Sequence, residues 1–133
     1  METTLKKIKL AYLETETRPW GTFYNLVDGE YKMKIIHITP NGQLSLQSHN
    51  KRAEKWISLE GTLTVKLGTD LENLKEYTLI PNQTINIPTG YIHQARNNTE
   101  KDIYFFELQT GSYFGEDDII RYSDIYGRVD SKK

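Results

Sequence analysis

The stretch from Leu44 to Gly61 reads LSLQSHNKRAEKWISLEG and combines two strand-like segments with a group of polar side chains. Gln47 and His49 are two residues apart, so a β-strand would place both side chains on the same face. Glu54 comes five residues after His49, at the beginning of the next strand-like segment, and Gly61 supplies the turn after it. The Gln-x-His and Glu side chains can therefore converge from two neighbouring strands.

A second polar group lies further along the chain, in the sequence from Pro88 to Asn97. Pro88 and Gly90 predict a tight turn, because proline presets one backbone angle and glycine tolerates the other. The turn directs His93 into the beginning of the following strand. The two polar groups are thus each placed at the start or end of a predicted strand.

Short strand-like segments separated by Gly, Pro and Asn extend on both sides of these two groups. Strands are expected at residues 22–26, 31–39, 44–49, 55–59, 62–67, 77–80, 84–87, 93–97 and 102–109. This regular spacing favours an antiparallel all-β sandwich or barrel over an α/β fold. Short helices are expected only near the ends, at residues 3–13 and at residues 116–122, where acidic residues come first and Arg121 comes late.

The composition limits the possible classes of protein. The chain has 133 residues, so we expect one domain over residues 1–133. Seventeen basic and 18 acidic residues nearly cancel, which argues against a nucleic-acid-binding protein. The absence of cysteine excludes disulfides, cysteine–zinc sites and thiol nucleophiles. The apolar run after the N-terminal lysines covers only residues 10–13, too short for a signal peptide or membrane span, so we expect a cytoplasmic protein without membrane partners.

The two polar groups together resemble the two motifs of the cupin superfamily. The first motif contains His-x-His, four residues, a Glu, six residues and a Gly. Gln47 stands in for the first His, and the later positions are matched by His49, Glu54 and Gly61. The second motif, Pro-x-Gly-x-x-His-x-x-x-Asn, is matched by Pro88, Gly90, His93 and Asn97. The glycine that leads each motif is imperfect, because Gly42 is one place off and Asn82 stands where the second would be.

This resemblance implies a double-stranded β-helix, a jelly-roll barrel that holds one divalent metal ion. The implied metal ligands are Gln47, His49, Glu54 and His93. Two imidazole nitrogens and two oxygens suit zinc, with manganese, cobalt, iron or nickel as alternatives. A single histidine in a strand is more often a polar residue with satisfied hydrogen bonds, and that interpretation is kept for His37.

A longer similarity covers residues 44–56, which resemble the signature Leu-Ser-Leu-Gln-x-His-x-His-Arg-Ala-Glu-His-Trp of type II mannose-6-phosphate isomerases. Matches to that family's opening block at residues 18–21 and closing block at residues 109–121 and 126–128 extend the resemblance from about residue 17 to 128. In most members this domain follows a mannose-1-phosphate guanylyltransferase domain, for which the chain has no room, so we expect the isomerase module alone. Lys51 and Lys55 replace two histidines of the family signature.

The resemblance implies an enzyme that interconverts mannose 6-phosphate and fructose 6-phosphate through a metal-stabilised enediol. Glu107 shares a strand face with Ile103 and Phe105 and is a candidate catalytic base, or alternatively a carboxylate at the rim paired with a lysine. Arg52 is a candidate for stabilising charge, or alternatively part of a salt bridge at a strand corner. The candidate phosphate-binding residues are Lys51, Lys55, Arg121 and Arg128. Asp117 and Asp118 are interpreted as the solvated beginning of the second helix.

Two other functions stay open at this point. One is a cupin that acts on a nucleotide-linked sugar in polysaccharide synthesis. The other is a non-catalytic module that binds a metal and a sugar phosphate, which the replacements at Lys51 and Lys55 favour. A homodimer is also expected, from the family and from the need to protect edge strands.

Overall fold

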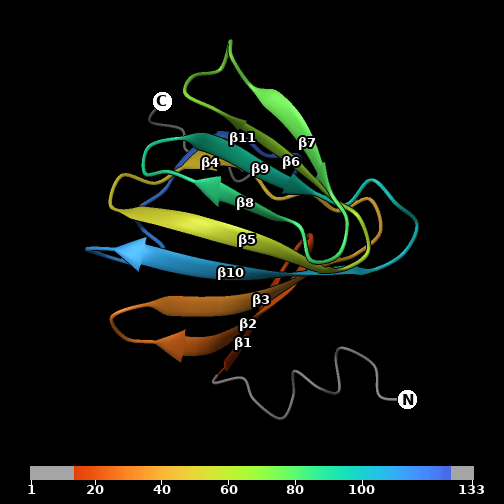
Figure 1. The fold of residues 1–133 in the computed structure, drawn as a ribbon, viewed down its shortest axis with the longest axis horizontal. Coiled ribbons are helices and arrows are strands. Elements are labelled where there is room, and N and C mark those ends of the chain that lie inside the picture. Colours follow the sequence, from red (N-terminus) through yellow and green to blue (C-terminus); the bar gives the residue numbers. More distant parts are fainter. Residues whose placement is uncertain (1–13, 127–133) are drawn as a thin grey trace.

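The computed structural model describes residues 14–126, which form two antiparallel β-sheets packed face to face (Figure 1). The strands of the described region are β1 (Glu14–Arg18), β2 (Gly21–Asp28), β3 (Lys32–Ile38), β4 (Leu46–Ser48), β5 (Arg52–Glu60), β6 (Leu63–Gly68), β7 (Lys75–Leu79), β8 (Thr84–Ile87), β9 (Ile92–Arg96), β10 (Ile103–Gly111) and β11 (Ile120–Ser123). One sheet has the order β1-β2-β3-β10-β5-β8, and the other has the order β11-β4-β9-β6-β7. This is the jelly-roll arrangement predicted from the sequence.

Strand periodicity decides which side chains enter the space between the sheets. Along β10, Ile103 and Phe105 point into the core, and Glu107 and Gln109 are buried on the same face further along. The predicted common face of this strand is therefore confirmed. The apolar core is completed by large side chains from both sheets, including Trp20, Phe23, Ile38, Trp56, Leu63, Val65 and Ile87. The polar end of β10 places Glu107 where this core gives way to a cavity.

Two turn positions explain the imperfect leading glycines of the motifs. Asn41, directly before Gly42, has φ of 62°, and Asn82 has φ of 78°. Asparagine tolerates this left-handed backbone region better than most residues. Both motifs thus keep the turn geometry that a glycine would provide, with asparagine in its place.

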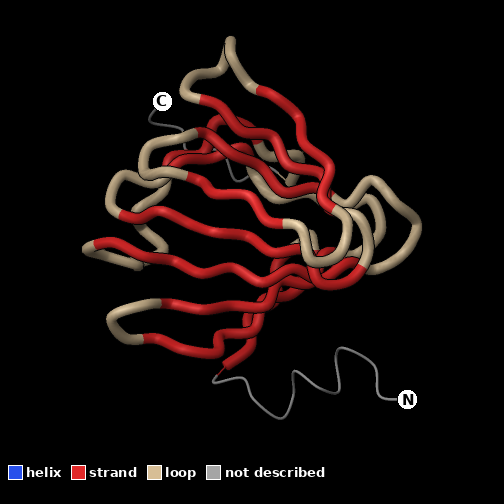
Figure 2. The backbone as a smooth tube through the Cα atoms, in the orientation of Figure 1, coloured by secondary structure: helices blue, strands red, loops and turns tan. Residues whose placement is uncertain are grey.

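The second predicted helix is wrong, and two strands were missed. Residues 116–119 form a turn, and residues 120–123 form β11, which pairs with β4 through Arg121 opposite Gln47. The acidic residues here do not begin a helix: Glu116 pairs with Lys34, Asp117 accepts a hydrogen bond from the hydroxyl of Tyr113, and Asp118 accepts from two backbone amides. β1 was missed because its sequence, ETETR, lacks apolar alternation. The helix predicted at residues 3–13 lies outside the described residues, and within residues 14–126 Figure 2 shows strands and loops only.

The structure also bears on the expectation about membranes. Among the described residues no helix has the length and apolar character needed to cross a bilayer.

Candidate functional site

Three of the four predicted metal ligands meet inside the barrel. His49 follows β4, Glu54 lies on β5 and His93 lies on β9, and their candidate ligand atoms are all within 4.8 Å of one another. The Nε2 atom of His49 is 3.4 Å from one carboxylate oxygen of Glu54, and Nε2 of His93 is 3.9 Å from the other. All three side chains are buried. The residues come from β5 in one sheet and from β9 and the end of β4 in the other, so the cluster depends on how the two sheets pack.

Backbone carbonyls fix the orientation of both imidazole rings. Nδ1 of His49 donates to the carbonyl of Asp118 at 2.6 Å, and Nδ1 of His93 donates to the carbonyl of Tyr91 at 3.1 Å. Each Nε2 atom therefore keeps its lone pair, and that of His49 accepts a hydrogen bond from Nη2 of Arg52. Nε2 of His93 is buried and has no hydrogen-bond partner. A buried acceptor without a partner is costly, so this atom fits the role of a metal ligand.

The protonation states also suit a cation. Burial lowers the pKa of His93 to about 4 against the opposing effect of Glu54, and burial likewise lowers the pKa of His49. Burial opposes ionisation of Glu54, but Arg52 and the two histidines outweigh it and hold its pKa well below the usual value. At neutral pH the cluster consists of two neutral imidazoles and one carboxylate, a donor set that suits a divalent transition metal.

Arg52 lies directly beside this cluster. Its Nε donates to Glu54 Oε2 at 2.8 Å, and its Nη2 is 3.1 Å from Nε2 of His49. Trp56 donates to the other oxygen of Glu54 at 2.8 Å. The salt bridge considered for Arg52 is therefore observed, and its guanidinium supplies positive charge to the same atoms that a metal would use. A metal ion and this position of Arg52 compete for Glu54 and His49.

Gln47 lies next to the cluster, directly opposite His93 in the pairing of β4 with β9. Its Oε1 accepts a hydrogen bond from the hydroxyl of Ser45 at 2.7 Å. One lone pair of the amide oxygen is thus engaged and a second is left for a ligand bond. The role of Gln47 as a fourth ligand stays a prediction.

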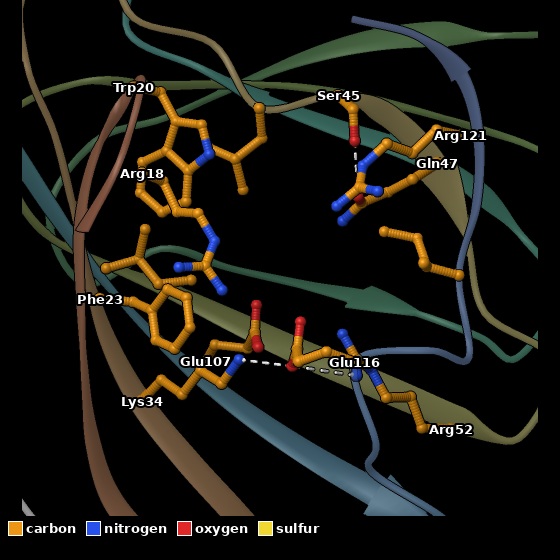
Figure 3. Close-up of a pocket in the computed structure, with 13 residues that line it drawn as sticks. Arg18, Trp20, Phe23, Lys34, Ser45, Gln47, Arg52, Glu107, Glu116 and Arg121 are labelled. Carbon is orange, nitrogen blue, oxygen red and sulfur yellow. Dashed lines mark hydrogen bonds and ion pairs between the residues drawn. The ribbon is translucent and has the colours of Figure 1, made fainter. Parts of the chain in front are cut away.

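A cavity of about 50 Å³ opens between the sheets beside Gln47 and Arg52 (Figure 3). Its wall includes apolar side chains such as Trp20 and Phe23. Its charged lining consists of four cations and two carboxylates: Arg18, Lys34, Arg52, Arg121, Glu107 and Glu116. Lys34 and Arg52 are both buried, and Nζ of Lys34 also lies 4.0 Å from the centre of the Phe23 ring. The cavity lining therefore holds more cations than carboxylates, although Arg18 is also paired with Glu16 and Arg52 with Glu54, neither of which lines the cavity.

Glu107 is a buried titratable residue in the lining of this cavity. Burial and the nearby charge of Glu54 raise its pKa to about 7, although Lys34 and Arg52 act in the opposite direction. Nε2 of Gln109 donates a hydrogen bond to its carboxylate. A carboxyl group with such a pKa can hold or release a proton at neutral pH, as a general acid or base must. The alternative position at an exposed rim is wrong, because the side chain is buried.

The predicted phosphate-binding residues divide into three groups. Arg121 lines the cavity. Lys51 and Lys55 do not line it: Lys51 is exposed with its Nζ over the Tyr113 ring, and Lys55 points outward from β5 because Glu54 and Trp56 on either side point inward. Arg128 lies outside the described residues.

Lys34, Arg18 and Glu116 were missed by the sequence reasoning. Lys34 has the same strand parity as Ile36 and Ile38, and that parity is a signal for the inner face. Asp118 was assigned to solvent, but its carboxylate accepts hydrogen bonds from the backbone amides of residues 50 and 51. It therefore holds the 112–119 segment against residues 49–51.

Comparison with known families gives a match over residues 6–124 to the model described as mannose-6-phosphate isomerase C-terminal. Similar curated proteins include alginate biosynthesis protein AlgA of Pseudomonas fluorescens, with 45% identity, and xanthan biosynthesis protein XanB of Xanthomonas campestris, with 41%. Mannose-1-phosphate guanylyltransferase of Escherichia coli K12 is 38% identical. Each match covers 84% of this chain but only 22 to 23% of the relative. The chain thus spans between a fifth and a quarter of the length of these relatives.

Solved structures agree on the fold. The capsular polysaccharide assembling protein CapF of Staphylococcus aureus has a TM-score of 0.73 at 14% identity, over 84% of this chain and 34% of CapF. Oxalate oxidase has a TM-score of 0.61 at 20% identity, over 69% of this chain and 46% of that protein. The cupin domain of Schizosaccharomyces pombe Cnp3 also matches, with a TM-score of 0.61 at 11% identity, over 68% of this chain and 64% of that domain. The cupin fold is therefore confirmed.

The same comparisons correct the expectation of an aldose–ketose isomerase. The relatives named above are a mannose-1-phosphate guanylyltransferase and proteins of alginate and xanthan synthesis, not plain isomerases. The prediction that this chain is simply a mannose-6-phosphate isomerase is contradicted by these relatives. Polysaccharide synthesis, held open as an alternative, fits them better.

Proposed function

The chain belongs to the mannose-6-phosphate isomerase C-terminal family, and we propose that it acts on nucleotide-linked mannose in polysaccharide synthesis. The names of its relatives support both parts of this proposal, since they concern guanylyl transfer to mannose 1-phosphate and the synthesis of alginate and xanthan. The cavity beside the His–Glu–His cluster is the proposed binding site for the phosphate of that ligand.

The observation that carries the proposal is the set of cationic side chains that line the cavity. Four cationic side chains face two carboxylates, and one of these, Glu107, has a pKa of about 7 and is ionised only in part at neutral pH. Lys34 and Arg52 are buried, and each is paired with a carboxylate of the chain, Glu116 and Glu54 respectively. These pairs leave Nη1 of Arg52 without a hydrogen-bond partner, and an anionic ligand would accept from it, since arginine is well suited to binding phosphate.

The size of the cavity limits which part of the ligand enters. A volume of about 50 Å³ corresponds to room for roughly four water molecules. A phosphate group is of that order, whereas a whole nucleotide sugar is several times larger. The proposal therefore places a phosphate in the cavity and the rest of the ligand toward its open side.

The metal cluster fits the same proposal. His49, Glu54 and His93, with Gln47 as the predicted fourth ligand, would hold one divalent ion, and zinc is the first candidate for this donor set. When bound, such an ion supplies a Lewis acid for a sugar or phosphate oxygen. The residues of the chain itself would bind the anion through Arg18, Lys34, Arg52 and Arg121 and hold a proton on Glu107.

Calorimetric titration of the 133-residue chain tests this function. We expect GDP-mannose and mannose 1-phosphate to bind in the presence of zinc, and unphosphorylated mannose not to bind. Affinity should fall as salt rises, because the attraction is electrostatic. NMR spectra of GDP-mannose incubated with the zinc-loaded protein would then identify a product.

A pair of arginine variants provides the matched control. Arg121→Gln removes a cation from the cavity lining and should weaken binding, whereas Arg96→Gln removes one that pairs with Glu76 outside the cavity. Failure of the wild-type chain to bind either phosphorylated compound, with and without zinc, would contradict the proposal.

A further inference from the structure

Glu116 of the chain itself reaches into the cationic cavity. It lies in the turn before β11, and its Oε2 is 3.1 Å from Nζ of Lys34 and 3.8 Å from Nη1 of Arg52 (Figure 3). The side chain of Glu116 is 47% exposed, whereas those of Lys34 and Arg52 are each 4% exposed. The carboxylate therefore enters from the solvent side and contacts two cations that are otherwise buried.

The contact with Glu116 leaves one nitrogen of the Arg52 guanidinium without a hydrogen-bond partner. Nε and Nη2 of Arg52 have partners in Glu54 and His49, but the buried Nη1 atom has no hydrogen-bond partner. Glu116 approaches Nη1 only to ion-pair distance, because the same oxygen is hydrogen-bonded to Lys34. One carboxylate oxygen thus serves two cations and forms a hydrogen bond with only one of them.

A phosphate group matches this arrangement better than a carboxylate does. Its several oxygens carry more negative charge and spread in three directions, so different oxygens can accept from the lysine ammonium and from the free N–H of the arginine. The unpartnered Nη1 of Arg52 is the donor that such a ligand would use. The carboxylate of Glu116 lies where such a phosphate would lie, and it makes one hydrogen bond fewer than the phosphate would, because it does not bond to Nη1 of Arg52.

We propose that Lys34 and Arg52 form the phosphate subsite of the cavity, and that Glu116 occupies it as an internal anion until a ligand phosphate displaces it. This inference rests on the proposed function, since it names the residues that hold the phosphate. It adds that the chain's own carboxylate occupies the subsite, so that ligand binding is an exchange of anions.

The exchange requires little movement of the backbone. Asp118, two residues further along, anchors the turn through its carboxylate to the amides of residues 50 and 51 and through its carbonyl to His49. Glu116 is about half exposed, so rotation of its side chain would return the carboxylate to water without burying any charge. Asp118 can therefore keep the turn in place while Glu116 leaves the cavity.

Variants of two neighbouring carboxylates distinguish displacement of Glu116 by phosphate from the general effect of removing one negative charge near the cavity. Glu116→Gln keeps the shape of the side chain but removes the competing anion. Asp117→Asn removes the same charge from the same turn, but Asp117 accepts a hydrogen bond from Tyr113 and does not line the cavity. The probe is inorganic phosphate, titrated by calorimetry at constant ionic strength into the chain with a chelator present, because the position of Arg52 described here competes with a metal ion for Glu54 and His49. The melting temperature of each variant is recorded to show that it is folded.

We expect Glu116→Gln to bind phosphate at least about tenfold more tightly than the wild type, the equivalent of one charge-assisted hydrogen bond. Asp117→Asn should bind as the wild type does, and Lys34→Met should lose most of the affinity. Glu116→Asp, whose shorter side chain cannot span the same distance, should also bind more tightly and serves if the glutamine variant is unstable.

Other outcomes would overturn the inference. If folded Glu116→Gln binds phosphate as tightly as the wild type or more weakly, Glu116 only forms a structural ion pair and does not compete with the ligand. If GDP-mannose binds equally to wild type, Glu116→Gln and Lys34→Met, the subsite is wrong but the proposed function stands. If neither GDP-mannose nor phosphate binds to any of these proteins, both proposals fail.

Discussion

Replacing Glu107 with Gln tests the electrostatics at the bottom of the cavity. In the folded chain the pKa of Glu107 is raised from 4.5 to about 7, first by burial and then by Glu54. Between these two pH values the unfolded chain releases a proton that the folded chain keeps, so the free energy of unfolding falls as pH rises. A difference of about 2.5 units at about 1.4 kcal/mol per unit gives a loss of about 3 kcal/mol, complete near pH 8.

Glu107→Gln should remove this pH dependence while keeping the local structure. The amide oxygen of the new side chain can still accept the hydrogen bond from Gln109. The stability of the variant relative to the wild type should therefore increase by about 3 kcal/mol between pH 4 and pH 8. Urea unfolding followed by tryptophan fluorescence at unit pH steps, with a chelator present to exclude metal effects, measures this difference.

Glu100→Gln is the matched control, because Glu100 is exposed in the loop before β10 and its replacement should give no such trend. A stability difference for Glu107→Gln that stays constant with pH would refute a raised pKa. A difference that changes in favour of the wild type as pH rises would show that Lys34 and Arg52 dominate over burial.

Three further changes test the cluster and the turns. His93→Ala should abolish stoichiometric divalent metal after dialysis, measured by elemental analysis, because it removes one of three converging ligand atoms, whereas His37→Ala should not. Gly61→Ala should destabilise the fold by about 1–3 kcal/mol more than Gly90→Ala in urea unfolding. Both glycines have φ of +85°, but only at Gly61 would the new methyl carbon lie within 2.5 Å of a β10 side chain. Asn97→Ala should cost about 2–4 kcal/mol, since the Asn97 amide donates to three backbone carbonyls; equal stability in urea would contradict that role.

Most of the strands could be predicted from the sequence because strand and turn signals are local. The alternation along residues 102–109 and the turn at Pro88 and Gly90 appear in the structure as predicted. β1 and β11 could not be recognised in this way. Both lie at sheet edges, and it is pairing with β2 and β4, not an apolar pattern of their own, that makes them strands.

The convergence of His49 and Glu54 was also within reach of spacing along the sequence, and the resemblance to the two cupin motifs added His93. Spacing within a strand fixes which side chains share a face, and the two turns fix where each strand begins. The same rule places Lys55 outside and Lys34 inside the barrel, so these two positions follow from parity once the strands are known.

The sequence by itself therefore determined the all-β class and most of the strands, and its resemblance to the cupin motifs indicated the barrel and the His–Glu–His group. Only the tertiary structure decided that Arg52 bonds to two of those ligands and that Glu116 meets Lys34 across 82 residues of chain. The physical reason is that local periodicity selects a face of a strand, whereas contacts between distant segments depend on how the sheets pair and where the loops run. The charge balance of the cavity arises from such contacts, and so it could not be derived from spacing alone.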